Sequence, residues 1–333
     1  MMERSVVLGA GSWGTTLADI LAQKGFEVAL WARNRELCEA ISKNNENETY
    51  LPGVKLSRNL RPVSSLEEAL NGATLIISAI PSHGVREILS NAIAYVPKDA
   101  ILVSATKGIE EGTHLMASGI LKDVLKADEK NIVILSGPTF AKEVSVKLPA
   151  AACAASTSTE AAEAVQKAFS TQHFRVYTNT DVTGVELGGA LKNVIAIAAG
   201  ISDGLALGFN ARAALITRGL AEITRLGVKL GANEKTFAGL SGLGDLVLTC
   251  TGPLSRNYTV GVEIGRSRNL DEIVKGMRMV AEGVKTSRAA QSLADMNGVD
   301  MPITRGVCEV LYHGKPPREA VLDLMMRQLK GEY

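Results

Sequence analysis

The chain has 333 residues, which is too long for one ordinary domain and predicts two. Apolar residues make up 46% and charged residues 21%, the balance of a soluble globular protein, and the formal net charge of +1 gives no sign of a nucleic-acid partner. The four cysteines form no Cys-x-x-Cys pair and the four histidines have no metal-ligand spacing. We therefore expect a reducing, cytoplasmic location, no metal, no signal peptide and no membrane span.

The chain opens with a short apolar strand, Arg4–Leu8, which leads into a glycine loop and a helix at Thr15–Lys24. This order of strand, G-x-G-x-x-G and helix is typical of dinucleotide-binding domains. Gly9 permits the tight turn, Gly11 lets the backbone approach a pyrophosphate, and Gly14 lets the helix pack close to the strand. The helix N-terminus supplies N–H groups for the anion.

The next strand, Glu27–Trp31, ends where the adenosine ribose of a bound dinucleotide is expected. NAD-specific proteins usually place a carboxylate there, but this chain has Ala32-Arg-Asn-Arg35. Guanidinium groups suit a 2′-phosphate, so Arg33 favours NADP over NAD without excluding NAD. A pair of solvated loop arginines is the alternative interpretation.

Further apolar strands alternate with helices and predict a parallel, doubly wound sheet. They are Thr74–Ile80, Ala100–Ser104, Ile132–Leu135, Ala150–Ala154 and His173–Tyr177. Residues 44–61 are polar and rich in turn formers, and we expect a connection on the surface. Ligands bind at the carboxyl ends of such strands, where Lys107 follows one strand and Gly137-Pro-Thr139 follows another. Ordinary loop and turn chemistry also explains these residues.

From residue 181 onward, β-branched runs give way to alanine, leucine and glycine. This change predicts an α/β Rossmann-type domain over 1–180 followed by an all-α C-terminal domain over 181–333. The expected helices are Val185–Ile201, Ala211–Leu226, Thr259–Ile264, Val284–Asp295, Ile303–Tyr312 and Arg318–Gln328.

The first of these helices is apolar on all sides, and Lys192 is its only cation. Burial lowers the pKa of a lysine, and a lysine with a near-neutral pKa can donate or accept a proton. A lysine that reaches out to water, or one that pairs with a carboxylate, is the alternative.

A glycine-rich segment, Ala238–Cys250, contains a single charge, Asp245. A carboxylate in apolar surroundings needs a partner, and we predict a loop that pairs Asp245 with Lys192. The following Ser255-Arg-Asn257 combines a plausible helix N-cap with an arginine and an amide, which suits a phosphate. An ordinary cap beside a surface arginine stays open.

Together these motifs resemble the bacterial soluble type of the NAD(P)-dependent glycerol-3-phosphate dehydrogenase family, over essentially the whole chain. The resemblance is carried by Gly9–Thr15, Ala105–Gly108, Ser136–Ala141, Leu191–Asn193, Gly239–Asp245 and Ser255–Asn257. The glycine loop is common to dinucleotide enzymes, whereas the other segments in this order are specific.

The resemblance implies a role for each matched residue. The implied cofactor-binding residues are Gly9, Gly11, Ser12, Trp13, Gly14, Arg33, Lys107, Ala141, Arg256, Val280 and Glu282. The implied substrate-binding residues are Lys107, Gly137, Thr139, Lys192, Asp245, Ser255, Arg256 and Asn257. Lys192 would be the catalytic acid/base, assisted by Lys107 and Asp245.

The implied reaction is reduction of dihydroxyacetone phosphate to sn-glycerol 3-phosphate, with NADPH preferred as the cofactor and NAD(H) as a second choice. Its product would feed glycerophospholipid synthesis. The apolar helical domain leads us to expect a homodimer.

Two other interpretations stay open. The 3-hydroxyacid and 6-phosphogluconate dehydrogenases also join a dinucleotide domain to a helical domain with a lysine in its first helix, but Ser255–Asn257 argues against them. A non-catalytic NADPH sensor is the second, and the presence of Lys107, Lys192 and Asp245 together argues against it.

Overall fold

The computed structural model describes residues 4–277, 281–329 and 331–332. Its internal contacts divide the chain into two compact units. The first comprises Met1–Lys107 and Leu115–Glu186, and the second comprises Gly108–His114 and Leu187–Tyr333. The sequence places the division after residue 180, whereas the contacts place it inside helix α8, Val182–Gly204.

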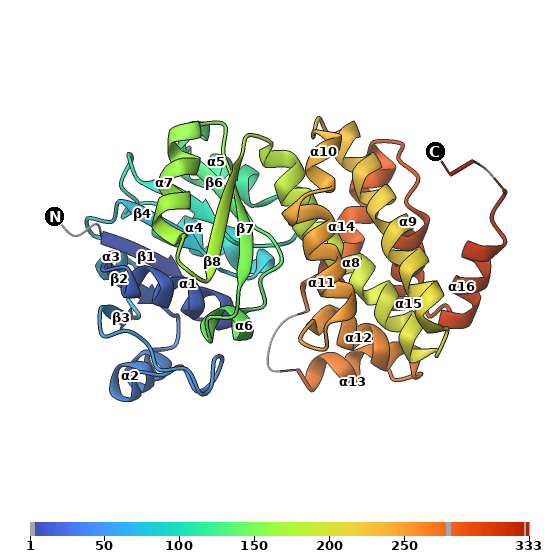
Figure 1. Cartoon of the computed structure of the whole chain (residues 1–333), viewed down its shortest axis with the longest axis horizontal. Helices are drawn as coiled ribbons and strands as arrows, with labels where there is room; N and C mark the ends of the chain where they lie inside the picture. The colour runs from blue at the N-terminus through green and yellow to red at the C-terminus, as the bar shows by residue number, and fades with distance from the viewer. Residues whose placement is uncertain (1–3, 278–280, 330, 333) are drawn as a thin grey trace. The chain divides into compact units, whose positions relative to one another are not determined.

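The first unit is an eight-stranded sheet with helices on both faces (Figure 1). Its strands are β1 Arg4–Leu8, β2 Glu27–Trp31, β3 Leu60–Val63, β4 Leu75–Ser78, β5 Ile101–Ser104, β6 Ile132–Ser136, β7 Ala150–Ala155 and β8 Phe174–Asn179. Its α-helices are α1 Ser12–Gln23, α2 Arg35–Asn44, α3 Leu66–Leu70, α4 Val85–Ala92, α5 Ala117–Leu125, α6 Ala141–Ser145 and α7 Thr159–Phe169, with short 3₁₀ turns at Ser82–Gly84 and Glu129–Asn131.

The strands lie in the order β3-β2-β1-β4-β5-β6-β7-β8. The prediction of a doubly wound α/β sheet is confirmed, with one correction to the strand directions. All neighbouring pairs are parallel except β6 and β7, which are antiparallel. The pair β7–β8 is parallel again, so the last two strands run opposite to the first six.

The apolar strands supply both faces of the sheet because successive side chains point to opposite sides. In β1, Val7 packs in a core with Leu17 of α1, while Val6 and Leu8 pack in a second core with Ile88 of α4. Burial on both faces explains why these strands read as continuous apolar runs.

The prediction of a surface connection at residues 44–61 is wrong in part. Its last residues begin β3, which pairs in parallel with β2. Within the connection, Leu51 and Leu56 are buried, and Asn47 is fully buried. The rest of the connection before β3 is exposed or half-buried, as predicted, and its buried side chains are two apolar ones and an amide with hydrogen-bond partners.

The second unit is helical. Its elements are α9 Gly208–Lys229, α10 Glu234–Phe237, a π-helical turn at Leu240–Gly244, α11 Asp245–Thr251, α12 Arg256–Gly265, α13 Leu270–Lys275, α14 Glu282–Met296, α15 Pro302–Tyr312 and α16 Pro317–Met325, together with most of α8. The six predicted helices are present, five with somewhat longer bounds, whereas α16 ends at Met325 and not at Gln328; α10, α11 and α13 are additional.

Helix α8 lies among the other helices of this unit (Figure 1). Close approach is possible because glycines stand at the contacts: a Cβ on Gly200 would lie 2.1 Å from Tyr258 O, and one on Gly219 would lie 2.5 Å from Ile195 Cγ2. By length and mean hydropathy, 1.3, α8 could span a membrane, which corrects the expectation that no apolar run is long enough. The apolar stretch is entirely buried in the protein, as in a core helix.

The predicted glycine-rich loop at Ala238–Cys250 is also wrong, because most of it is helical. The π-helical turn continues directly into α11, with Asp245 as its first residue. The glycines are required by packing: a Cβ on Gly242 would lie 2.1 Å from Phe237 O, and one on Gly188 would lie 2.5 Å from Ser241 O.

Candidate active site

The glycine loop between β1 and α1 has two glycines that the protein itself requires. Gly9 has a φ of +111°, and a Cβ there would lie 2.9 Å from Ala79 O. A Cβ on Gly14 would lie 1.9 Å from Gly9 O. A Cβ on Gly11, by contrast, would meet nothing within 4 Å, so this glycine leaves open space at the loop.

The N-terminus of α1 is available to an anion. The helix begins at Ser12 with no capping side chain and no acidic residue in its first turn, so its N–H groups and positive dipole end are not neutralised. Trp13 packs edge-on against Phe174, with ring centroids 6.3 Å apart, and its buried Nε1–H has no hydrogen-bond partner among the described residues. These features and the open space at Gly11 fit a dinucleotide pyrophosphate.

The first residue of α6, Ala141, lies beside this loop. The hydroxyl of Thr16 donates to Ser12 O at 2.9 Å and lies 3.4 Å from Ala141 O. The structure therefore brings together two predicted cofactor-binding positions, Ser12 and Ala141, that are far apart in the sequence.

Arg33 follows the end of β2 and is 67% exposed. Its guanidinium pairs with the equally exposed carboxylate of Glu87, with Nη2 and Oε1 3.0 Å apart. An exposed pair of this kind contributes little, so Arg33 can exchange Glu87 for a phosphate at small cost.

Three predicted substrate residues of the first unit are linked by hydrogen bonds to the backbone carbonyl of one of them, Gly137. Lys107 Nζ donates to Gly137 O at 3.1 Å, and Thr139 Oγ1 donates to the same oxygen at 3.2 Å. Gly137 has a φ of +150°, and a Cβ there would lie 2.9 Å from Ala152 Cα, which requires glycine. The turn after β6 thus holds the Lys107 ammonium that follows β5.

In the second unit, the predicted pairing of Lys192 with Asp245 is confirmed. The lysine side chain is 8% exposed and the aspartate 1%, and Nζ bonds directly to Oδ1. Nζ also donates to Thr249 Oγ1 at 2.8 Å, and that hydroxyl is 2.6 Å from Asp245 O. A buried ammonium is thus fixed between a carboxylate and a hydroxyl.

Sequence reasoning missed Thr249. It lies four residues after Asp245, so the two side chains share one face of α11. That spacing would have signalled Thr249 if the segment had been recognised as helical. Burial raises the pKa of the neighbouring Cys250 thiol to about 12, which keeps that thiol protonated.

Ser255 is the N-cap of α12, as predicted, since its Oγ accepts from Tyr258 N at 3.2 Å. Asn257 Nδ2 donates to Asn193 Oδ1 at 2.9 Å, and Asn257 Oδ1 accepts from Gly283 N at 2.9 Å. Asn257 therefore ties α12 to α8 and α14, in addition to its predicted contact with phosphate.

Arg256 is the first residue of α12, and its side chain is exposed. The surrounding protein lowers the pKa of its guanidinium, and the charge of Glu282, the first residue of α14, raises it. These two predicted cofactor-binding residues are thus electrostatic neighbours. Val280, the other predicted residue of this segment, lies outside the described residues.

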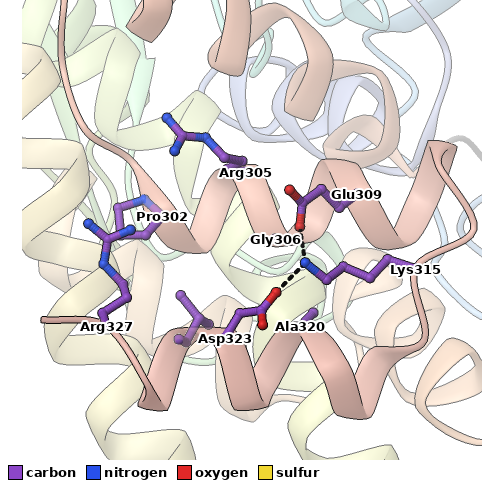
Figure 2. A pocket seen from close by; sticks show the side chains of 9 residues that line it. Pro302, Arg305, Gly306, Glu309, Lys315, Ala320, Asp323 and Arg327 are labelled. Carbon is purple, nitrogen blue, oxygen red and sulfur yellow. Dashed lines mark hydrogen bonds and ion pairs between the residues drawn. The ribbon is translucent and has the colours of Figure 1, made fainter.

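No group of three or more His, Cys, Asp or Glu side chains suited to a metal ion occurs in the described ranges. Two cavities lie apart from the predicted site residues. One of about 100 Å³ lies between α15 and α16, where Lys315 bonds to both Glu309 and Asp323 (Figure 2). The other, of about 400 Å³, lies along α1, near Lys24 and Phe174. Neither is lined by a predicted site residue.

Comparison with known proteins identifies the family of both parts of the chain. The profile described as "NAD-dependent glycerol-3-phosphate dehydrogenase N-terminus" matches residues 5–162, and the corresponding C-terminus profile matches residues 181–322.

Individual relatives match over their whole length. The glycerol-3-phosphate dehydrogenases (NAD(P)+) of Citrifermentans bemidjiense and of Geobacter sp. strain M21 are 55% and 54% identical, over 100% of this chain and 99% of theirs. The crystal structure of glycerol-3-phosphate dehydrogenase from Coxiella burnetii is 36% identical, with a TM-score of 0.94 over 98% of this chain and 99% of that one.

Proposed function

The chain belongs to the NAD-dependent glycerol-3-phosphate dehydrogenase family, and from this premise we propose that it reduces dihydroxyacetone phosphate to sn-glycerol 3-phosphate with NAD(P)H. The observation that carries this proposal is the buried contact of Lys192 with Asp245 and Thr249. Burying an ammonium costs desolvation free energy, and buried charged groups with specific partners are concentrated at functional sites.

Residues 1–180 bind the dinucleotide in this proposal, and 181–333 bind the substrate and supply the proton. The bound cofactor supplies a hydride to the carbonyl carbon. The chain's own task is then to hold the ligands and to deliver one proton to the carbonyl oxygen. The open space at Gly11 and the uncapped start of α1 support the first role.

Lys192 donates the proton from Nζ to the oxygen as negative charge develops there. Asp245 orients the ammonium and stabilises its charged form, and Thr249 accepts from a second N–H of Nζ and further fixes its orientation. Lys107 contributes a second positive charge, held ready by the Gly137 carbonyl.

Ser255, Arg256 and Asn257 bind the substrate phosphate. Ser255 and Asn257 are held in place by hydrogen bonds at the start of α12, and Arg256 is exposed and charged. Anchoring a group remote from the reaction supplies binding energy that orients the carbonyl.

The finer features of the proposal are a cytoplasmic homodimer that prefers NADPH and whose product supplies glycerophospholipid synthesis. Large apolar side chains exposed on the helical unit support a subunit interface: Phe209 is 78% exposed, Met325 76% and Leu329 95%. Sedimentation equilibrium tests the dimer, and a single species of monomer mass would refute it.

The decisive experiment is the loss of reduced-nicotinamide absorbance with dihydroxyacetone phosphate, using NADPH and NADH in parallel. Turnover of the phosphorylated substrate, with none of unphosphorylated dihydroxyacetone, is expected. Tight NADPH binding without turnover would instead favour a sensor, and turnover of a hydroxyacid alone would favour the neighbouring dehydrogenase class.

Replacing Arg33 with alanine tests the cofactor preference. Loss of one charged contact to the 2′-phosphate should reduce the NADPH-to-NADH ratio of kcat/KM by about tenfold. Arg61→Ala is the matched control, because Arg61 is also exposed and paired, with Glu68, and lies outside the Ala32–Arg35 segment. An unchanged ratio in Arg33→Ala would remove Arg33 from the cofactor site.

A further inference from the structure

The connection between α2 and β3 buries one polar side chain completely, that of Asn47. Its Nδ2 donates to Ala10 O at 2.9 Å and to Thr15 Oγ1 at 2.8 Å. Its Oδ1 accepts from Tyr50 N at 3.2 Å. Both amide hydrogens are therefore used, and both bonds reach the glycine loop from a segment more than 30 residues away.

These two bonds hold the glycine loop at both sides of its turn. Ala10 lies between Gly9 and Gly11, and Thr15 lies in the first turn of α1. In a trans peptide the carbonyl and the next N–H point in opposite directions. Because Ala10 O points toward the buried Asn47, the Gly11 N–H points away from Asn47.

The chemistry at this position requires an amide. The Ala10 carbonyl can only accept a hydrogen bond, so its partner must be a donor. A carboxylate of the same size would place an oxygen against that carbonyl, and an aliphatic side chain would leave the carbonyl buried and unpaired. Asn47 itself is held in place by its own turn, since its carbonyl accepts from Leu51 N at 2.7 Å and Leu51 is buried.

We propose that Asn47 is a positioning residue for dinucleotide binding: its amide fixes the Ala10–Gly11 peptide and the first turn of α1 in the conformation that receives the pyrophosphate. This inference rests on the proposed function only in assuming that the glycine loop binds NAD(P). Asn47 acts through the loop and does not touch the cofactor.

The test is Asn47→Asp in the full-length protein, with the affinity for NADPH measured from the fluorescence of the bound nicotinamide in the absence of substrate. We expect the Kd for NADPH to rise by about 10- to 100-fold, the range for a buried polar group left unsatisfied. Once NADPH saturates the variant, kcat and the KM for dihydroxyacetone phosphate should stay close to those of the wild type.

Asn59→Asp is the matched control. Asn59 lies in the same connection, and its Nδ2 also donates to a backbone carbonyl, Ala22 O at 3.3 Å. Ala22 lies in the last turn of α1, at the opposite end of the helix from the glycine loop. The Kd of Asn59→Asp for NADPH should stay within about twofold of the wild type, since this hydrogen bond is only partly buried and lies at the end of α1 away from the glycine loop. If Asn47→Asp does not fold, Asn47→Ala adds no charge and is judged by the same criterion.

The inference is overturned if the folded Asn47 variant binds NADPH as tightly as Asn59→Asp does. It is also overturned if kcat and both KM values change together, because Asn47 would then only stabilise the fold. A wild-type protein that binds NADPH but does not turn over the triose phosphate would refute the proposed reaction and leave the comparison of variants valid. A wild type that binds neither NADPH nor NADH would refute both.

Discussion

The two groups of candidate site residues are built in opposite ways. At the glycine loop of the first unit, Gly11 leaves open space and the groups available to an anion are backbone N–H donors. In the second unit the working groups are side chains, and Lys192 and Asp245 are almost completely buried among helices. A site made of backbone groups is damaged when a side chain is added, and a site made of side chains is damaged when a side chain is removed.

Lys192→Ala should have the largest effect. Loss of the proton donor is expected to lower kcat by about 10²- to 10⁴-fold, while the Kd for NADPH changes little, because the glycine loop belongs to the other unit. Steady-state kinetics measures the loss of kcat, and the fluorescence of bound NADPH measures its Kd. Lys122→Ala, which removes an exposed lysine paired with Glu129, is the control and should retain activity. Near-normal turnover in Lys192→Ala would exclude Lys192 as the acid.

Adding a methyl group at the glycine loop should have the next largest effect. The position of the methyl group decides whether it lowers stability or only weakens NADPH binding. Gly14→Ala places a Cβ 1.9 Å from Gly9 O, so we expect a loss of about 3 kcal/mol in the free energy of unfolding together with weaker NADPH binding. Gly11→Ala meets no protein atom and should weaken NADPH binding without lowering Tm. Thermal unfolding beside NADPH titration separates them, and an equal loss of Tm in both would contradict this account.

The smallest effect concerns a buried carboxylate outside the site. Glu222 is as buried as Asp245, but it accepts from the backbone N–H groups of Ile303 and Thr304 at the start of α15, at 2.6 and 3.2 Å, and not from an ammonium. Burial raises the pKa of Glu222 from its ordinary value of 4.5 to about 7.

The sign of the pH dependence follows from that shift. The folded state keeps the proton on Glu222 up to about pH 7, whereas the unfolded chain releases it near pH 4.5, so this group's contribution to stability is present below pH 4.5 and is lost as the pH rises to about 7. Glu222→Gln should flatten the fall of Tm over this range. Part of the fall of Tm with pH should remain in this variant, because burial also raises the pKa of Glu186 to about 7. An unchanged slope would show that Glu222 does not titrate in this window.

Local sequence patterns predicted the first unit better than the second. The bounds of β1 and β2 agree with the sequence because apolar strands and the glycine turns between strand and helix are encoded by neighbouring residues. The partner of Lys192 could be predicted because Asp245 is the single charge in an apolar segment. Thr249 was missed because its spacing from Asp245 is informative only once the segment is known to be helical, and nothing beside Asn47 in the sequence indicates what it contacts.

Other features were hidden because packing overrides propensity. Glycines weaken helices, so a segment with Gly239, Gly242 and Gly244 reads as a loop, although close contacts keep it helical. Strand β3 contains Pro62, which disfavours a strand in the sequence but is accepted here because β3 is the edge strand beside β2. The sequence of β7 is nearly all alanine and carries no information about direction.

The reversal of β7 and β8 changes which segments lie at the same edge of the sheet as the glycine loop. The first six strands end at one edge of the sheet, and β7 and β8 begin there because they run the other way. At this edge the first six strands are followed by loops, whereas β7 and β8 are preceded by them. Phe174, the first residue of β8, therefore contacts Trp13 at the start of α1. The loop after β7 lies at the opposite edge, but Ser156 is buried there and Ser158 caps α7, so the exposed Thr157 is the position where a substitution should disturb neither the fold nor the glycine loop.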